Sequence, residues 1–449
     1  MRTVIRGFAR RPVRIVPVGF AAAILVASAL LMLPIASRGP GGTRFLDAVF
    51  TATSSVAVTG LITVDTPTYW SGFGQAVILA CMQLGGLGIM TTAALLGLLA
   101  GRRLGLRSRL MTRAELHQGI GIGEVKTVLL KAVTVTFITE LAIAVVLALR
   151  FDLAYGLGRG ESAWMGIFHG VSSFNNAGFA LFSDSIMSYA TDPWISLPLC
   201  AGTIIGGLGM PVLFELTRRG WGRGRWSIHT KMTLLGTVVL LLGGWFVLLG
   251  FEWSNPGTLG QFPWPDRFLP AFFQSAVLRT SGFNSIDVGA MHDHSLLVSI
   301  VLMFIGGGAA STAGGIKVTT FFVLLWVIWA EVRSEPDVSA FQRRLGMPVI
   351  REALSVALVY AALNAAAVIL MQIFEPHIPL TPIMFEVASA AATVGQSTGI
   401  TASLSDPSKW LLIAVMYGGR IGPVLFTTSL AMRTRKRLYR HPEGRPLVG

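Results

Sequence analysis

Four glycines in this sequence each follow a phenylalanine by ten positions, with many small and polar residues in between. The intervals run from Phe50 to Gly60, Phe168 to Gly178, Phe272 to Gly282 and Phe385 to Gly395. Glycine permits positive φ, so that successive backbone carbonyls can point in one direction. Carbonyls arranged in this way can replace the water shell of a dehydrated cation. The four intervals therefore predict a cation site built from backbone.

The residues directly before each glycine are mainly small or β-branched, and none of them is acidic. A ring of acidic side chains would favour a divalent cation, so this composition favours a carbonyl filter for a weakly held monovalent ion. The candidate filter residues are Val58, Thr59, Gly60, Asn176, Ala177, Gly178, Thr280, Ser281, Gly282, Thr393, Val394 and Gly395. Because the copies are unequal, we expect the arrangement to be only roughly fourfold.

A further glycine-rich segment, GGGAASTAGG at 306–315, interrupts an apolar run and is followed by Lys317. Glycine is unfavourable in a helix interior, so we expect a loop near the middle of the membrane. The alternative is close helix packing through the glycines. The segment is not a phosphate-binding loop, because the Gly-x4-Gly-Lys-Ser/Thr spacing is absent.

Several charged residues lie within or beside apolar runs. An unpaired cation at Arg420 would cost at least ~2.5–3.5 kcal/mol in the membrane, so we expect it to face the pore and bond carbonyls of segment 306–315. A purely structural or snorkelling arginine is the alternative. We expect Arg279 to point behind the filter, with Asp47 or Glu386 as its partner. Glu140 receives no firm role.

No catalytic or metal-binding constellation stands out in the sequence. The seven histidines show no metal-ligand spacing, and no nucleophile has a base at a suggestive position. Cys81 and Cys200 both lie in apolar runs, where small packing residues are common. We therefore predict that the protein is not an enzyme and has no covalently bound cofactor.

The elements that position these segments must be membrane helices. Of the 449 residues, 53% are hydrophobic and only 13% are charged, whereas a soluble domain has about 25% charged residues. Uncharged stretches such as 15–37, 66–101 and 353–374 reach the roughly 20 residues that a spanning helix requires. The net charge of +14 lies in clusters on every second loop, which is the positive-inside pattern and not that of a nucleic-acid binder. We expect both termini to be cytoplasmic.

Each Phe-to-Gly interval lies between two apolar runs, on the side opposite the basic clusters. The sequence thus predicts an all-α polytopic membrane protein with four helix–pore-loop–helix repeats, or eight transmembrane helices, around one central pore. The outgoing helices are expected at 15–36, 128–149, 232–251 and 353–374, and the returning helices at 74–100, 194–216, 295–330 and 410–432. The repeats span 15–100, 128–217, 232–330 and 352–432, and the cytoplasmic segments are 1–14, 101–127, 218–231, 331–351 and 433–449.

Three of the segments carry a family resemblance. AVTGLITVD (57–65), RTSGFNSID (279–287) and ATVGQSTGIT (392–401) resemble filter segments of the TrkH/KtrB/HKT potassium transporter family. The resemblance covers nearly the whole chain and is strongest to KtrB, because the first repeat begins almost at once. The chain departs from the family at Gln396, where an apolar residue is usual, and NNAGF in the second repeat is less typical of a filter.

The resemblance implies a potassium uptake channel or transporter in the bacterial plasma (inner) membrane, with Na+ as a candidate activator. It implies a homodimer with one pore per subunit, surrounded by membrane lipid, and cytoplasmic RCK-type regulatory subunits (KtrA- or KtrC-like) that bind ATP or ADP. It also makes segment 306–315 an intramembrane gate. The candidate gate residues are Gly306, Gly307, Gly308, Ala309, Ala310, Ser311, Thr312, Ala313, Gly314, Gly315, Lys317 and Arg420.

Two other functions remain open on the sequence. A coupled secondary transporter, such as a sodium–potassium symporter, would often have inverted repeats and broken helices. Here all repeats have the same predicted topology, which favours a central pore. A membrane enzyme would require paired polar catalytic residues in a cavity, and the sequence indicates none.

Overall fold

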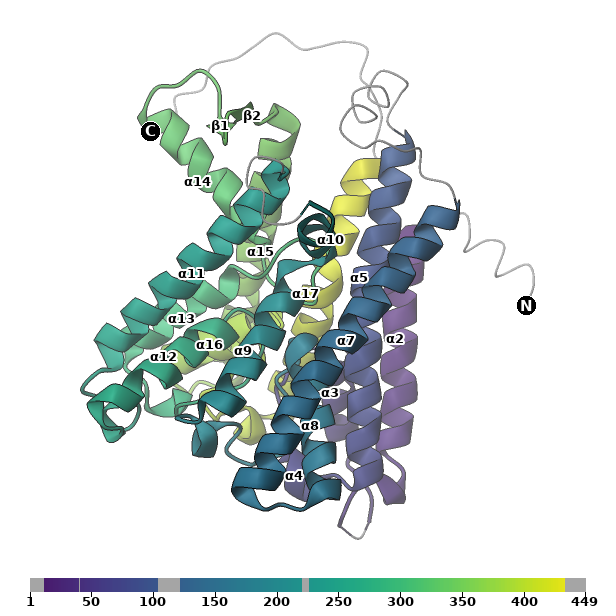
Figure 1. The fold of residues 1–449 in the computed structure, drawn as a ribbon, viewed down its shortest axis with the longest axis vertical. Helices are drawn as coiled ribbons and strands as arrows, with labels where there is room; N and C mark the ends of the chain where they lie inside the picture. The colour runs from purple at the N-terminus through teal and green to yellow at the C-terminus, as the bar shows by residue number, and fades with distance from the viewer. Residues whose placement is uncertain (1–11, 40, 104–121, 220–225, 433–449) are drawn as a thin grey trace.

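The computed structural model describes residues 12–39, 41–103, 122–219 and 226–432. The expected cytoplasmic segments 1–14, 101–127, 218–231 and 433–449 therefore lie partly or wholly outside the described residues. Within the described residues the chain is mostly helical, and long helices run roughly along the longest axis of the molecule (Figure 1).

The helices follow the predicted order in each of the four repeats. The outgoing helices are α2 (Pro12–Leu31), α7 (Ile122–Tyr155), α11 (Ile228–Glu252) and α15 (Met347–Phe374). The short helices that precede the four glycines are α3 (Phe45–Val56), α8 (Arg159–Phe174), α12 (Phe268–Val277) and α16 (Leu380–Ala391). The returning segments are α5 (Gly72–Arg103), α9 (Pro193–Leu208) with α10 (Met210–Arg219), α13 (Asp293–Phe304) with α14 (Val318–Val332), and α17 (Asp406–Met432).

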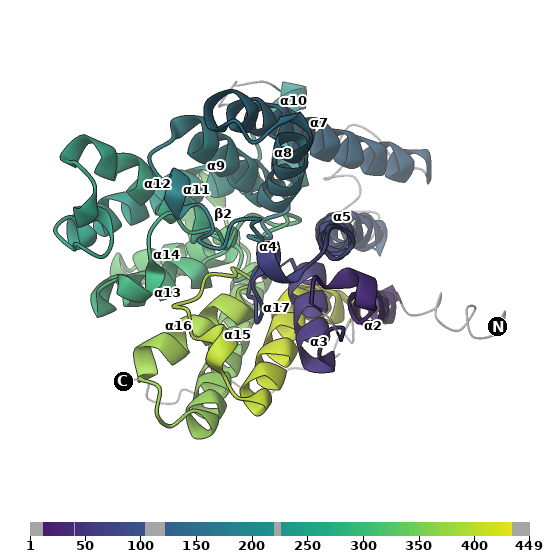
Figure 2. The ribbon, with the colours of Figure 1, turned by 90° about the horizontal axis from the view of Figure 1, so that it is seen from below.

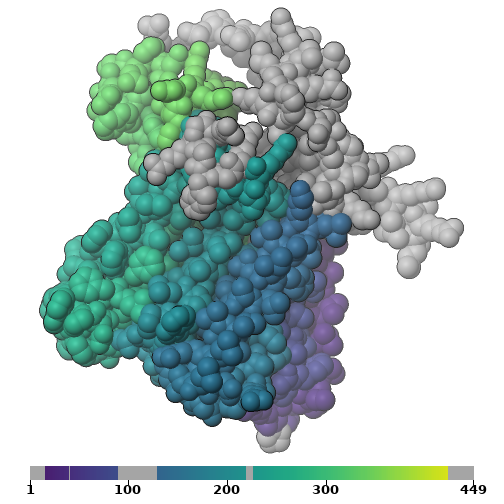
Figure 3. Space-filling view, viewed as in Figure 1, coloured from purple at the N-terminus to yellow at the C-terminus, as the bar shows by residue number. Residues whose placement is uncertain are grey.

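Short elements connect these helices. They are α4 (Thr66–Tyr69) and the 3-10 turns Pro34–Ala36, Met187–Tyr189, Leu259–Gln261, Trp264–Arg267, Val288–Ala290 and Thr401–Ser403. Strands β1 (Ser339–Ala340) and β2 (Arg343–Arg344) pair antiparallel in the segment after α14. Together with α14 they project away from the main body (Figures 1 and 3).

The structure corrects several of the predicted helix boundaries. Helix α7 covers 122–155 instead of 128–149, and α15 begins at residue 347 instead of 353. The first helix ends at Leu31 instead of residue 36, because Leu33 lies before Pro34 and takes an extended conformation. The second returning helix is not continuous over 194–216. It breaks at Gly209, which has φ 90° and ψ 148°, and the two halves are bent by 97°. The third returning helix is interrupted at the expected glycine-rich segment.

The helices carry the apolar surface of a multi-pass membrane protein. Among the described residues, the segments long and apolar enough to cross a membrane are Leu129–Tyr155, Ile228–Glu252 and Met347–Phe374, with α9 and the first part of α10 as a bent pair. Shorter apolar helices accompany them. Large side chains on the outside are strongly exposed, for example Leu153 at 81% and Leu25 at 68%, as expected for a surface that faces lipid tails.

The repeats follow one another around the middle of the molecule. Seen from below, purple, blue, green and yellow segments succeed each other around the centre (Figure 2). The last repeat closes on the first, since the Tyr417 hydroxyl of α17 donates a hydrogen bond to the carbonyl of Pro17 in α2 at 2.8 Å. Buried side chains from both ends of the chain share one core cluster, in which Ile421 packs with residues of α2 and α3.

Candidate cation site

The site begins where the short helices end. The residue two positions before each glycine has positive φ: 51° at Val58, 59° at Asn176, 91° at Thr280 and 49° at Thr393. In three repeats the next N–H reaches back five residues, from Thr59 to Ser54, Ala177 to Ser172 and Val394 to Ser389, at 2.8–2.9 Å. This bond is that of a Schellman helix end, which requires a left-handed residue at this point. The helix end thus sets the unusual conformation.

The third repeat ends its helix differently. The N–H of Ser281 bonds the carbonyl of Val277, four residues earlier, at 2.8 Å, and Thr280 has the largest φ of the four equivalent residues. The four segments are therefore alike in conformation but not identical, as the unequal sequences predicted.

The four glycines form a closed ring. Gly60, Gly178, Gly282 and Gly395 all have positive φ, between 62° and 94°. A Cβ built on Gly60 would lie 2.5 Å from the carbonyl oxygen of Ala177, and one on Gly282 would lie 2.6 Å from that of Val394. In the same way, a Cβ on Gly178 would overlap the carbonyl oxygen of Ser281, and one on Gly395 would overlap that of Thr59. The segments therefore meet in chain order, and glycine is required at each junction.

The carbonyls of the ring have no hydrogen-bond donors in the described protein. No hydrogen bond from a described residue reaches the carbonyl oxygens of the candidate filter residues, although nearly all of these residues are buried. Buried carbonyls almost always have a partner. Carbonyls that do not bond protein at membrane depth are suited to line an ion path.

Side chains join neighbouring segments behind the ring. The amide nitrogen of Asn176 donates hydrogen bonds to the carbonyls of Ser173 and Thr203. Its amide oxygen accepts a hydrogen bond from the Thr280 hydroxyl at 3.1 Å. Gln396 donates to the carbonyl of Phe283 at 2.7 Å and accepts from Gln274 at 3.0 Å. Gln396, where the resemblance led us to expect an apolar residue, therefore ties the fourth segment to the third.

A cavity of about 370 Å³ opens on one side of the ring and touches all four glycines. Asp65 and Asp184 line it. Asp65 accepts hydrogen bonds from the hydroxyls of Thr68 and Ser183 at 2.5 and 2.7 Å. Acidic side chains in a cavity raise the local concentration of cations, so this cavity can serve as a vestibule to the ring.

The glycine-rich segment lies against the opposite side of the ring. Its ends are joined by a bridge between Ile305 and Ile316, and residues 306–308 and 311–316 are buried. Gly314 packs directly on Ala392 and Thr393 of the fourth segment, where a Cβ would overlap both residues. The Thr312 hydroxyl donates a hydrogen bond to the carbonyl of Phe174 at 3.2 Å. The loop thus contacts the ends of two short helices.

The same loop is bonded to the break between α9 and α10. The N–H of Gly308 donates to the carbonyl of Gly207 at 2.8 Å, and the N–H of Met210 donates to that of Ala310 at 3.3 Å. A Cβ on Gly209 would overlap the carbonyl of Ala309. This contact was not predicted from the sequence. The run GGLG at 206–209 was the only signal for it.

Two cations hold the loop carbonyls. Arg420 is 3% exposed and donates from Nη1 to the carbonyl of Thr312, as predicted, while its Nε and Nη2 have no partner among the described residues. The Lys317 ammonium donates to the carbonyl of Ala313 at 2.7 Å. Both positive charges therefore lie close to the loop.

Arg279 lies behind the ring, but its predicted partners were wrong. Its guanidinium bonds the carbonyl and hydroxyl of Thr237 in α11, both at 3.4 Å, and its Nε has no partner among the described residues. Glu386 instead accepts a hydrogen bond from Thr401. Among the described residues no ion pair joins Arg279 to Asp47 or Glu386.

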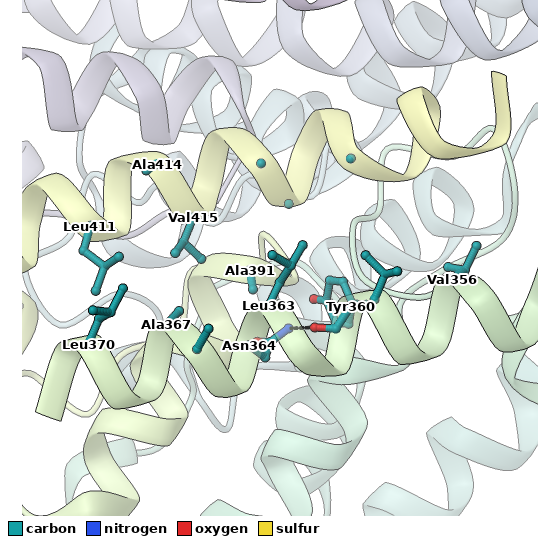
Figure 4. A pocket seen from close by; sticks show the side chains of 15 residues that line it. Val356, Tyr360, Leu363, Asn364, Ala367, Leu370, Ala391, Leu411, Ala414 and Val415 are labelled. Carbon is teal, nitrogen blue, oxygen red and sulfur yellow. Dashed lines mark hydrogen bonds between the residues drawn. The ribbon is translucent and has the colours of Figure 1, made fainter. Parts of the chain in front are cut away.

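Another cavity, of about 340 Å³, lies between α15 and α17 (Figure 4). Its lining is apolar and includes Leu363, Leu370 and Val415, and it reaches Ala391 at the end of α16. Asn364 lies within it but bonds the carbonyl of Tyr360 in its own helix at 2.9 Å. None of its lining residues is charged, so the cavity is not suited to bind a cation.

The fold that carries the ring is shared with a known membrane transporter. The crystal structure of the potassium transporter TrkH from Vibrio parahaemolyticus matches with a TM-score of 0.72 at 19% identity, covering 95% of this chain and 85% of that one. At this identity the likeness concerns the fold alone.

Sequence comparison then gives the family. The family model TrkH, a cation transport protein, matches residues 24–435. Ktr system potassium uptake protein B of Bacillus subtilis (strain 168) is 38% identical over 441 residues, covering 98% of this chain and 97% of the relative. The protein of the same name from Vibrio alginolyticus is 40% identical over 438 residues, covering 97% and 94%. The chain belongs to the TrkH family of cation transport proteins.

The family assignment confirms the resemblance inferred from residues 57–65, 279–287 and 392–401. Because the family consists of transport proteins, it also supports the prediction that this chain is not an enzyme.

Proposed function

We propose that this chain is the ion-translocating subunit of a potassium uptake system and that K+ crosses the membrane through the glycine ring. The observation that carries the proposal is the closed ring of four positive-φ segments whose carbonyls receive no hydrogen bond from described residues. Such carbonyls can replace the water around K+. The potassium uptake function of two relatives of 38% and 40% identity supports the choice of ion.

In this proposal each repeat contributes an outgoing span, a pore helix, a filter segment and a returning span, which gives eight spans. The cavity with Asp65 and Asp184 is the outer vestibule, and both termini are cytoplasmic. The membrane is the bacterial plasma membrane. Its potential drives cation entry by about 2.3 kcal/mol per charge for each 100 mV.

Segment 306–315 acts as the gate in this proposal. It lies on the inner side of the ring, and Arg420 and Lys317 both bond its carbonyls. Two positive charges at this position oppose the passage of K+. The loop leads directly into α14, which starts at Val318, so a displacement of α14 would move the loop and clear the path.

We further propose that the chain works as a homodimer with cytoplasmic RCK-type regulatory subunits that bind ATP or ADP. The projecting α14 and the hairpin β1–β2 offer a surface on which such a ring could act (Figure 3). The names of two relatives refer to a Ktr system, which supports an assembly of several components.

Sodium coupling is the second candidate function. The potassium/sodium uptake protein NtpJ of Enterococcus hirae is 34% identical over 447 residues, covering 98% of this chain and 97% of the relative. In that case Na+ would be a transported ion as well as a candidate activator.

Rescue of potassium-uptake-deficient bacteria at low external K+ tests the main proposal. We expect the chain, expressed with a regulatory partner, to restore growth and K+ uptake that excess Na+ barely reduces. Competition by equal Na+ would favour the second candidate. A protein that reaches the membrane but restores no cation uptake would contradict both.

A further inference from the structure

A buried carboxyl group lies behind the second filter segment, and neither conduction nor the gate accounts for it. Glu140 is in the middle of α7 and is 4% exposed. No cationic side chain pairs with it in the part of the chain that the structure describes. An ionisable residue at membrane depth is costly and is therefore expected to have a function.

The carboxyl group of Glu140 is held by two amides. Its Oε1 accepts a hydrogen bond from Nδ2 of Asn175 at 2.9 Å, and its Oε2 accepts one from Nε2 of Gln83 at 3.1 Å. Asn175 Nδ2 also lies 2.9 Å from Oε1 of Gln83. The three side chains thus form a closed triangle of donors and acceptors, which we call the amide–carboxyl triad. It joins α5, α7 and the end of α8.

The position of Asn175 connects the triad to the ring. Asn175 is the residue at the end of α8, and the next residue, Asn176, has the positive φ from which the filter segment starts. Asn176 in turn contacts Thr280 of the third segment. A shift of Asn175 would therefore move the second segment and change its contact with the third.

Glycines make room for the triad. A Cβ on Gly86 of α5 would overlap Oδ1 of Asn175, and one on Gly170 of α8 would lie 2.9 Å from the carbonyl oxygen of Glu140. The side chain of Asn175 is therefore packed directly against the backbone of α5, and α7 and α8 approach each other closely at Glu140. The equivalent positions in the other repeats are Ala57, Arg279 and Ala392. Among the four repeats, only the second has an amide there.

We propose that Glu140 is a positioning residue for ion selectivity: through Asn175 it fixes the second filter segment, and so sets the spacing of the carbonyls that distinguish K+ from Na+. The inference rests on the proposed function of the ring. In this proposal Glu140 acts through Asn175 and not by contact with the ion, since both of its carboxyl oxygens accept hydrogen bonds from amides of the triad.

The triad permits an exchange experiment. In Glu140→Gln an amide N–H2 faces another amide N–H2, and in Gln83→Glu two carboxyl groups face each other. In the double variant Q83E/E140Q the carboxyl group moves from α7 to α5, and every donor again faces an acceptor. We expect each single variant to lower the K+ over Na+ preference by up to roughly tenfold, which corresponds to the loss of one buried hydrogen bond. The double variant should lie within about threefold of the original chain, because the lost interaction is restored.

Uptake with competing Na+ is measured at equal amounts of membrane protein. Thr139→Val is the matched control and should keep the preference. Among the described residues, the Thr139 hydroxyl bonds the carbonyl of Val135 in its own helix and no group of the triad. Glu140→Asp keeps the carboxyl group but shortens its reach, so it serves if Glu140→Gln fails to insert, and it should also lower the preference.

Gly178→Ser in the same assay separates the two proposals. If Gly178→Ser loses selectivity while the Glu140 variants keep it, the inference is wrong and the filter stands. If Gly178→Ser also keeps selectivity, the proposed filter is wrong. The inference would likewise be overturned if the double variant had no higher K+ over Na+ preference than the less selective of the two single variants. The triad would then not act through its hydrogen bonds.

Discussion

Replacing Gly282 by serine perturbs the ring at one defined junction. The added Cβ would lie 2.6 Å from the carbonyl oxygen of Val394 and 3.1 Å from the Cα of Gly178, at a φ of +72°. Cβ contacts below 3.0 Å essentially do not occur. The third and fourth segments must therefore move apart by at least 0.4 Å, the difference between 3.0 and 2.6 Å.

This displacement acts on the carbonyls that would contact the ion. A left-handed conformation costs a residue with a Cβ roughly 1–2 kcal/mol, and a loss of this size in ion binding corresponds to a factor of about 5–30. We expect the K+ over Na+ preference of Gly282→Ser to fall by such a factor. Expression should change little, since the helices around the ring keep their packing.

Ion flux into liposomes at matched protein density measures the effect, with K+ and Na+ in competition. Gly399→Ser is the control, because Gly399 also has positive φ, at +92°, but a Cβ there would meet nothing within 4 Å. It should keep the preference for K+. An unchanged preference in well-inserted Gly282→Ser, or an equal loss in Gly399→Ser, would refute the reasoning.

Three further predictions concern the gate and the topology. Deleting Ala309–Ala313 should raise flux in liposomes and reduce the dependence on regulatory subunits. Arg420→Ala should do so more mildly and add little to the deletion, whereas unchanged flux or simply additive effects would show that Arg420 does not latch the loop. Gly209→Ala should also raise flux, since its Cβ would push the carbonyl of Ala309 away; normal flux would mean that this contact is not part of the gate. A cysteine near Asp287 should react with an impermeant thiol reagent outside intact cells and one near Arg344 should not, and reversed labelling would overturn the orientation.

The sequence predicted the helix order because each element has a local signal. Apolar length marked the long helices, and the four glycines marked the junctions of the ring. It could not predict the positive φ of Val58 or Thr393, since β-branched residues rarely adopt it. That conformation is imposed by the hydrogen bonds at the helix end, which become visible only in three dimensions.

Long-range side-chain partners were the least predictable feature. Arg279 was expected to meet Asp47 or Glu386 on charge alone, but it faces Thr237 of α11. The same limit applies to Glu140, whose amide partners come from α5 and the end of α8. Sequence spacing does not reveal which faces of distant helices meet. Opposite charge alone was therefore not enough to predict which side chains would pair.

The junction between Gly395 and Thr59 has a consequence for the making of the protein. The two residues are 336 positions apart in the chain, from 395 − 59. At 5–20 residues per second, the ribosome needs roughly 20–70 s to synthesise the intervening chain. During this time the first segment is already made, while its final neighbour does not yet exist. The nascent first repeat must therefore shelter its carbonyls by other means until the fourth repeat inserts, and this interval is when a membrane chaperone or insertase would be needed most.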